Sequence, residues 1–434
     1  MGYSQTPSEN SSQSLQLFGM AAEKGRWIFV ALGLAINVCL GSIYSWSVFR
    51  LPLQKFFSAD ATASLLPFIV FLAFFALLMP FAGGPLDKYG PRKLTVLGGI
   101  VVGIGWILGS QASDITTLTL AYGVVGGAGV GIAYNAPIGV SGRWFPDRRG
   151  LAVGLTVLGF GISPLITAPL ANYLIGAYGV LTSLGYLGVA FLILIVLLGL
   201  PLRFPDAGWK PRGWTPQQAG VACEELNRPQ MVRTRGFWGL WLGFFIGTLA
   251  GLMAIGISSP TGQEVFKLSA ATAAALVGVF AVFNGIGRPI FGYLVDRTGP
   301  RNTAITSFVI IAVAAAMLGF GAAPGATAIY VIGFCALWLC LGGWLAIAPA
   351  CTAAFCGTKY YGPNYGLVFT AYGAGAIIGN LLAGRLRDVV GSYVAVFYPV
   401  AALAVVGIVI AFVLIRPPRQ QKGDRTAVAG IAGT

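Results

Sequence analysis

Arg288 is the residue of this 434-residue chain whose type and position most clearly indicate chemistry. It lies within an apolar stretch at 270–294, in the run Asn284-Gly285-Ile286-Gly287-Arg288-Pro289. A charge at that depth is costly in a bilayer and is retained mostly where it has a function. We expect Arg288 to be the only formal charge deep inside a long apolar stretch, and one fixed cation predicts a site for one anion. The alternative is an arginine whose side chain extends to the membrane surface.

Asn284 precedes Arg288 by one helical turn and therefore shares its face of a helix. An amide can hydrogen-bond a hydroxyl or a carbonyl group of a ligand, but it cannot titrate. We predict that Asn284 contacts the same ligand as Arg288. A hydrogen bond to a neighbouring helix is the alternative role for this side chain.

The composition indicates a membrane protein. Hydrophobic residues make up 56% of the chain and charged residues 9%, whereas soluble domains carry about 25% charged residues. The chain has no histidine, and its six cysteines form no Cys-x-x-Cys pair, so we expect no zinc, haem or other cofactor. No paired acids lie in an apolar stretch and no Walker pattern is present, which argues against an enzyme and against ATP-driven transport.

Twelve apolar runs are long enough to cross a bilayer as helices. We place them at 26–50, 62–84, 93–112, 117–141, 150–172, 181–203, 236–260, 270–294, 303–323, 326–352, 364–386 and 392–416. The only long polar stretch between them predicts a cytoplasmic linker at 204–235 that joins six-helix bundles at 26–203 and 236–416. Residues 1–25 and 417–434 are predicted to be cytoplasmic tails, and the first of these shows no cleavable signal peptide.

The basic residues predict the orientation. With the N-terminus inside, most of the 27 lysines and arginines fall on the inner side, while Arg50, Lys55, Lys267, Arg385 and Arg387 fall outside. This distribution follows the positive-inside rule and places both termini in the cytoplasm. It also explains the net charge of +14 without a nucleic-acid partner; the partner implied is the lipid bilayer.

A short motif occurs twice, about half a chain length apart. Asp87-Lys88-Tyr89-Gly90-Pro91-Arg92 follows the second run, and Asp296-Arg297-Thr298-Gly299-Pro300-Arg301 follows the eighth. The repeat predicts two related halves, a common plan for transporters with a central site. We predict that Asp87, Arg92, Asp296 and Arg301 form gating loops whose charges pair at helix ends.

These loops resemble the signature loop of the major facilitator superfamily. The segment from Arg143 to Gly154 resembles the entry to the fifth span in monocarboxylate transporters and in their bacterial oxalate/formate antiporter relatives. Gly129–Tyr134, Asn284–Pro289 and Asn364-Tyr365-Gly366 are similar to that branch as well, and the similarity covers nearly all of the chain outside the tails and the linker. The resemblance implies an all-α integral membrane fold of twelve transmembrane helices in two six-helix pseudo-symmetric halves, and secondary active transport by alternating access.

The resemblance also implies roles for particular residues. Arg288 matches an arginine that contacts the substrate carboxylate, and a planar guanidinium suits that contact because it can donate two parallel hydrogen bonds. Asn284 stands where vertebrate monocarboxylate carriers have an aspartate implicated in proton handling. The positions that match or complete the pocket wall are Tyr44, Tyr134, Phe369, Asn37 and Leu158.

Tyr372 is the main departure from the oxalate-carrying relatives, which have a lysine at this position. Two cations suit a dianion and one cation suits a monoanion, so the exchange of lysine for tyrosine favours a monocarboxylate. The alternative role of Tyr372 is packing.

These observations predict a transporter for a small monocarboxylate, such as lactate or pyruvate, in the inner (plasma) membrane. We expect proton symport, although none of the 13 acids lies deep in a span; the proton could accompany the substrate. Two alternatives remain: a carboxylate exchanger of the oxalate/formate type, and a carboxylate receptor that does not transport.

Overall fold

The computed structural model describes residues 16–81, 83–206, 208–211, 225–357 and 359–415. The predicted tail at 417–434 lies outside these residues, as do parts of the predicted tail at 1–25 and of the linker at 204–235. The described chain is almost entirely helical. Its one sheet is a hairpin in which β1 (Gln16–Leu17) pairs antiparallel with β2 (Met20–Ala21).

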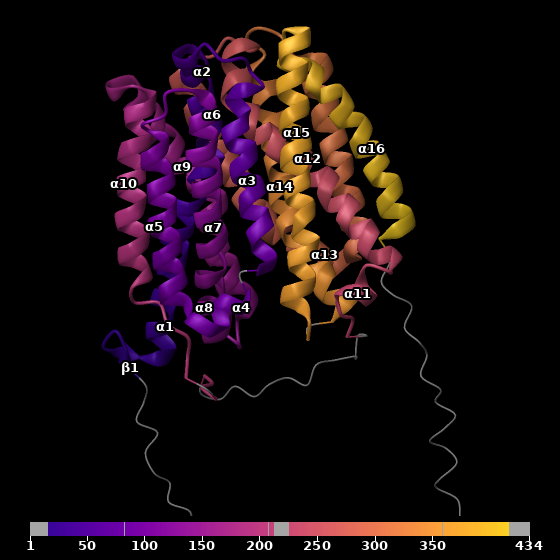
Figure 1. The fold of residues 1–434 in the computed structure, drawn as a ribbon. Helices are drawn as coiled ribbons and strands as arrows, with labels where there is room; N and C mark the ends of the chain where they lie inside the picture. The colour runs from indigo at the N-terminus through magenta and orange to yellow at the C-terminus, as the bar shows by residue number, and fades with distance from the viewer. Residues whose placement is uncertain (1–15, 82, 207, 212–224, 358, 416–434) are drawn as a thin grey trace, which may run out of the picture.

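Two groups of helices lie side by side, the N-terminal group in indigo to magenta and the C-terminal group in rose to yellow (Figure 1). The first group consists of α1 (Ala22–Leu40), η1 (Gly41–Ser45), α2 (Trp46–Phe57), η2 (Ala63–Leu65), α3 (Leu66–Leu78), η3 (Met79–Phe81), α4 (Gly83–Tyr89), α5 (Pro91–Gly109), α6 (Ile115–Leu118), η4 (Thr119–Gly126), α7 (Gly127–Ala133), α8 (Asn135–Trp144), α9 (Arg149–Tyr178) and α10 (Val180–Gly199). The second consists of α11 (Arg228–Met231), α12 (Arg235–Glu264), α13 (Ala270–Gly321), α14 (Thr327–Cys356), α15 (Tyr361–Val390), η5 (Tyr393–Val396) and α16 (Phe397–Leu414).

The described residues contain eleven helical segments that are long and apolar enough to cross a membrane. The longest, Ala270–Gly321, has 52 residues and includes Gly299, whose φ of 81° and ψ of 163° are not helical. Two helices therefore meet at Gly299, and counting them separately gives the twelve expected spans. The predicted all-α membrane fold is confirmed.

The two glycines of the repeated motif adopt the same backbone conformation. Gly90 has φ 81° and ψ 165°, and Gly299 has φ 81° and ψ 163°. This region of backbone space is accessible essentially only to glycine. In both places a proline follows at the start of the next helix, where its missing N–H costs no helical hydrogen bond. The motif thus forms the same turn in each half.

The first span is longer than the predicted 26–50. It continues through η1 and α2, so that the apolar segment covers Ala22–Phe57. Arg50, the last residue of the predicted span and assigned to its outer side, lies within this segment and is 0% exposed. Arg50 is therefore a second buried charge in a long apolar segment, in addition to Arg288. Arg50 is accommodated because protein acceptors surround its guanidinium group.

Those acceptors come from both halves. On its own side, Arg50 donates through Nη2 to the Ala61 carbonyl at 2.8 Å and to the Ser64 hydroxyl at 3.1 Å. Across the interface it donates through Nη1 to the Gly256 carbonyl at 3.2 Å and through Nη2 to the Tyr393 hydroxyl at 2.9 Å. Arg50 thus joins α2 to α12 and η5.

Asp388 of α15 makes the reciprocal contact. Its carboxylate accepts hydrogen bonds from the backbone N–H of Ala61 at 2.9 Å, from that of Thr62 at 3.0 Å, and from the Thr62 hydroxyl. We call the contacts of Arg50 and Asp388 the polar clasp. It lies at the distal end of the bundle, which we define as the end opposite to the one where α1 begins and α16 ends (Figure 1).

Helices from the two halves also pack together along the interface, α9 against α13 and α3 against α15. Glycines, which have no side chain, allow α13 and α14 to pack closely together. A β-carbon at Gly342 would lie 2.0 Å from the Asn284 carbonyl oxygen, and one at Gly287 would lie 2.3 Å from that of Leu339. These two glycines allow the backbones to touch at Asn284 and at Gly287, and so they position the segment that carries Arg288.

Candidate anion site between the two halves

Arg288 lies at the interface between the halves, on α13 facing α9. It is 8% exposed, and its Nη1 donates to the Val157 carbonyl of α9 at 3.1 Å. Its Nε and Nη2 are buried and have no hydrogen-bond partner. Arg288 forms no ion pair with any residue that the structure describes. Unpaired buried donors on a cation are costly, so this arrangement suits an anion that accepts from both nitrogens.

Asn284 lies one helical turn before Arg288, and only the N–H side of its amide has a hydrogen-bond partner. Nδ2 donates to the Trp338 carbonyl of α14 at 3.2 Å, and this contact fixes the amide orientation because a carbonyl oxygen can only accept. Oδ1 is buried and has no partner. A β-carbon at Gly161 would lie 2.7 Å from Asn284 Oδ1 and 3.4 Å from Arg288 Nε. The unpaired acceptor and an unpaired donor therefore face the same point of α9.

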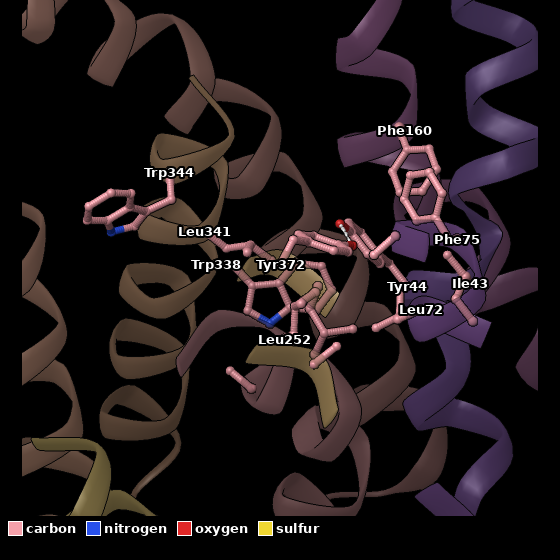
Figure 2. Packing of buried hydrophobic residues seen from close by; sticks show 14 of the residues in the cluster. Ile43, Tyr44, Leu72, Phe75, Phe160, Leu252, Trp338, Leu341, Trp344 and Tyr372 are labelled. Carbon is pink, nitrogen blue, oxygen red and sulfur yellow. Dashed lines mark hydrogen bonds between the residues drawn. The ribbon is translucent and has the colours of Figure 1, made fainter. Parts of the chain in front are cut away.

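Tyr44 and Tyr372 connect the two halves beside this point. Their hydroxyl groups share a hydrogen bond of 2.8 Å between η1 and α15, as Figure 2 shows. Both rings are buried, and both hydroxyls lie within electrostatic range of Arg288. The structure therefore brings Tyr372 to the predicted site and pairs it with a second predicted residue.

Phe369 and Tyr134 belong to the same aromatic cluster. Phe369 stacks on Tyr372 with ring centroids 4.8 Å apart, and the Tyr134 side chain lies beside the Arg288 guanidinium. Phe75 of α3 contacts both of these residues: its ring centroid lies 5.2 Å from that of Tyr134 and 5.6 Å from that of Phe369. Pairs at such separations add stability beyond the area they bury.

The last two predicted pocket residues lie on different faces of the interface. Leu158 is adjacent to the site, because a β-carbon at Gly285 would lie 2.8 Å from Leu158 Cδ1. Asn37 packs on α9 at Gly159, two residues from Gly161. Since residues two apart on a helix face different directions, Asn37 borders another face of α9 from the one that faces Asn284.

Sequence reasoning did not identify several residues that border the site. The ring centroid of Phe160 lies 5.1 Å from that of Tyr44, and the ring centroid of Trp338 lies 6.4 Å from it. The backbone carbonyl of Trp338 also accepts the hydrogen bond from Asn284. These residues, with Phe75, stand in uniformly apolar runs where no polar neighbour marks them. The Val157 carbonyl is a backbone group, so no residue type could signal it.

The predicted gating loops lie at the end of the bundle where α1 begins. Asp87 of α4 forms an ion pair with Arg143 of α8, and both side chains are substantially exposed. Arg92 and Asp296 are exposed, and the Arg301 guanidinium lies 3.9 Å from the centroid of the Phe412 ring. Their gating role stays a prediction.

A second ion pair at this end is more buried. Arg26 at the start of the first span contacts Asp147 through Nη1–Oδ1 at 2.5 Å and Nη2–Oδ2 at 2.8 Å. The hydrogen bond from Arg26 lowers the pKa of the Asp147 carboxyl below its ordinary value of 3.8. The pair ties α1 to the loop between α8 and α9.

A separate cavity of about 890 Å³ lies nearer the distal end, between α2, α9, α12 and α13. Its lining includes Lys55, Asn172, Ser259 and Gln263, and none of the predicted site residues. The lining includes no residue of the polar clasp either, and the cavity is distinct from the Arg288 site.

Comparison with known proteins identifies the family. The sequence profile of the Major Facilitator Superfamily matches residues 30–362 and 250–432. The chain belongs to the major facilitator superfamily. It is 31% identical over 379 residues to the oxalate:formate antiporter of Oxalobacter formigenes, a match that covers 87% of this chain and 88% of that protein. It is 28% identical over 345 residues to monocarboxylate transporter 13 of Rattus norvegicus, covering 76% and 74%.

A solved structure has the same fold. The crystal structure of a bacterial homologue of the human lysosomal transporter Spinster, in an inward-facing and occupied conformation, superposes with a TM-score of 0.67 at 17% identity, covering 90% of this chain and 97% of that one. The chain is therefore a multi-pass membrane transporter of the branch that contains oxalate:formate antiporters and monocarboxylate transporters, and it is not an enzyme.

Proposed function

We propose that this transporter moves a small monocarboxylate, such as lactate or pyruvate, by alternating access with symport of a proton. The observation that carries the proposal is the pair of unpartnered nitrogens on Arg288, at the interface that must open and close. Nε and Nη2 of a guanidinium lie on one edge and match the two oxygens of a carboxylate. Substrate would thereby neutralise a buried cation, which lowers the cost of the buried charge.

The charge at the site favours one carboxylate over two. The side chain that meets Tyr44 across the interface is the neutral Tyr372, where oxalate-carrying relatives have a lysine. With Arg288 as the cation of this cluster, a second carboxylate would remain unpaired in a buried position, which is costly. The relatives named oxalate:formate antiporter and monocarboxylate transporter support a small carboxylate as the substrate class.

We also propose the orientation and the boundaries. The basic residues favour the inner membrane with both termini in the cytoplasm, which makes the distal end the outer side. The bundles are 26–203 and 236–416, joined by the linker at 204–235. Under this orientation the polar clasp joins the halves on the outer side, and rocking of the halves about Arg288 would break it.

Uptake of labelled lactate into empty, sealed proteoliposomes tests the proposal. With an inward proton gradient, we expect accumulation above equilibrium, and collapse of the gradient should remove it. A lack of uptake of lactate, pyruvate and other short monocarboxylates under every condition would contradict the proposed substrate class.

Carboxylate exchange is the second candidate, and the similarity to an antiporter over most of the chain favours it. The empty carrier retains an unpaired buried cation at Arg288, which by itself disfavours return without an anion. Uptake only into vesicles preloaded with unlabelled acid, unchanged by the proton gradient, would establish exchange and remove the proton from the mechanism.

A further inference from the structure

The unpaired groups at the Arg288 site form a set that no plain carboxylate satisfies. Arg288 offers two buried donors, and Asn284 offers one buried acceptor, Oδ1. The donor half of the same amide is already bound to the Trp338 carbonyl. A ligand that fills the set must accept two hydrogen bonds and also donate one.

The acceptor and the donors are adjacent. Asn284 is fully buried, and its Oδ1 and Arg288 Nε face the same point of α9, where Gly161 has no side chain. α9 packs closely against both atoms, because a β-carbon at Gly161 would lie only 2.7 Å from Oδ1. A ligand therefore reaches them when the halves move apart. The group that donates to Oδ1 must therefore lie next to the carboxylate that binds Arg288.

We infer that the site selects 2-hydroxy monocarboxylates over the corresponding 2-oxo and unsubstituted acids, with Asn284 Oδ1 accepting the 2-hydroxyl proton. The inference rests on the proposed function. In a 2-hydroxy acid the hydroxyl is on the carbon next to the carboxylate, so donor and carboxylate are neighbours as the site requires. A 2-oxo acid places a second acceptor against Oδ1, and an unsubstituted acid leaves Oδ1 unpaired.

The physical cost of a mismatch gives the expected size of the preference. A buried acceptor left without a partner weakens binding by about tenfold or more. A site that hydrogen-bonds a hydroxyl therefore rejects analogues that lack it, and does so far more strongly than an apolar pocket rejects a change of size. Asn284 acts here as a specificity-determining residue, whereas Arg288 determines binding of every carboxylate.

The test measures binding to the purified full-length transporter by thermal stabilisation, with lactate, pyruvate and propionate as one series and glycolate, glyoxylate and acetate as another. We expect the hydroxy acid of each series to bind about tenfold or more tightly than its partners. Equal affinities within both series would overturn the inference while leaving the monocarboxylate proposal standing. Absence of binding by all six acids would contradict both.

Variants identify the responsible group. Asn284→Leu should bring the three acids of each series to within about twofold of one another, because the acceptor is gone while Arg288 remains. The matched control is Asn380→Leu, since Asn380 is also a fully buried amide with an unpaired Oδ1, next to Gly256. It should keep the preference for the hydroxyl. A preference that survives Asn284→Leu would show that another group reads the hydroxyl and would overturn the assignment.

Discussion

At the scale of single residues, two buried arginines differ in what surrounds them. Arg50 is bound by carbonyl and hydroxyl oxygens from both halves, whereas Arg288 leaves Nε and Nη2 without partners. A buried cation with satisfied donors serves the protein's own structure, and one with vacant donors is prepared for a ligand. The sequence alone distinguishes the two poorly, because both stand in apolar surroundings.

Tyr372 carries the prediction on charge selectivity. Tyr372→Lys adds a second cation at the tyrosine pair and should shift the preference from lactate toward oxalate or malonate by about tenfold or more, because a second carboxylate then gains a charged partner. Competition of unlabelled acids against labelled substrate in proteoliposomes measures the shift. Tyr372→Phe is the control, since it removes the hydroxyl without adding charge. An unchanged order of acids in Tyr372→Lys would refute the argument from one cation.

At the scale of elements, the sequence predicted the helices well and their close contacts poorly. Apolar length located every span, and the Asp-x-x-Gly-Pro-Arg motifs predicted turns whose glycines share one conformation. The first span was placed too short, at 26–50, whereas the apolar segment covers Ala22–Phe57. What apolar length cannot predict is which faces meet, since a helix that is apolar all round has no preferred side.

The same limit explains the part of the site that sequence did not identify. Arg288 and Asn284 were recognisable because polar groups are rare in such helices. Phe75, Phe160 and Trp338 were not, because an aromatic residue in an apolar run looks the same whether it faces lipid or substrate. The contact between Tyr44 and Tyr372 joins positions far apart in the chain, and only the packing of α13 on α9 and of α15 on α3 brings them together.

The Arg26–Asp147 pair gives an element-scale prediction with a defined pH dependence. Because the folded-state pKa of Asp147 is lowered, the pair stabilises the folded state above the ordinary pKa of 3.8 and loses this effect as the pH falls through the folded-state value. Asp147→Asn should therefore lower the free energy of unfolding by about 1–3 kcal/mol near pH 7, and the deficit should shrink below pH 3.8. Thermal unfolding of the wild type and of Asp147→Asn, from pH 7 to below pH 3.8, measures the difference in stability. A deficit that is constant with pH would exclude the ion pair as the cause.

At the scale of the whole molecule, the interface between the halves contains two distinct polar regions, the polar clasp at the distal end and the Arg288 site. The clasp is reciprocal: a cation of the N-terminal half binds oxygens of the C-terminal half, and a carboxylate of the C-terminal half binds N–H groups of the N-terminal half. Each contact joins a charged group to a neutral partner, so the clasp holds the halves together without an ion pair between them. Such contacts can form and break during a transport cycle without stranding an ion pair.

Loss of the clasp should expose the interior to the outer side. Arg50→Gln and Asp388→Asn each remove charged hydrogen bonds between the halves, so the population open at the distal end should rise by about tenfold. A cysteine at buried Leu252, in a chain whose six native cysteines are replaced by alanine, should then react faster with a membrane-impermeant thiol reagent added outside. Arg26→Gln is the control, because Arg26 pairs with Asp147 within one half and makes no contact with the clasp. Unchanged labelling in both clasp variants would show that the clasp does not close this end.

The most direct test of the central claim compares labelled lactate uptake by the wild-type transporter with uptake by Arg288→Ala and Arg288→Lys in matched proteoliposomes, after checking that each variant is inserted and monodisperse. We predict that Arg288→Ala abolishes uptake, because no other described cation faces the site, and that Arg288→Lys retains little, because an ammonium group lacks the two-pronged geometry. Normal uptake by Arg288→Ala would contradict the assignment of Arg288 as the carboxylate site.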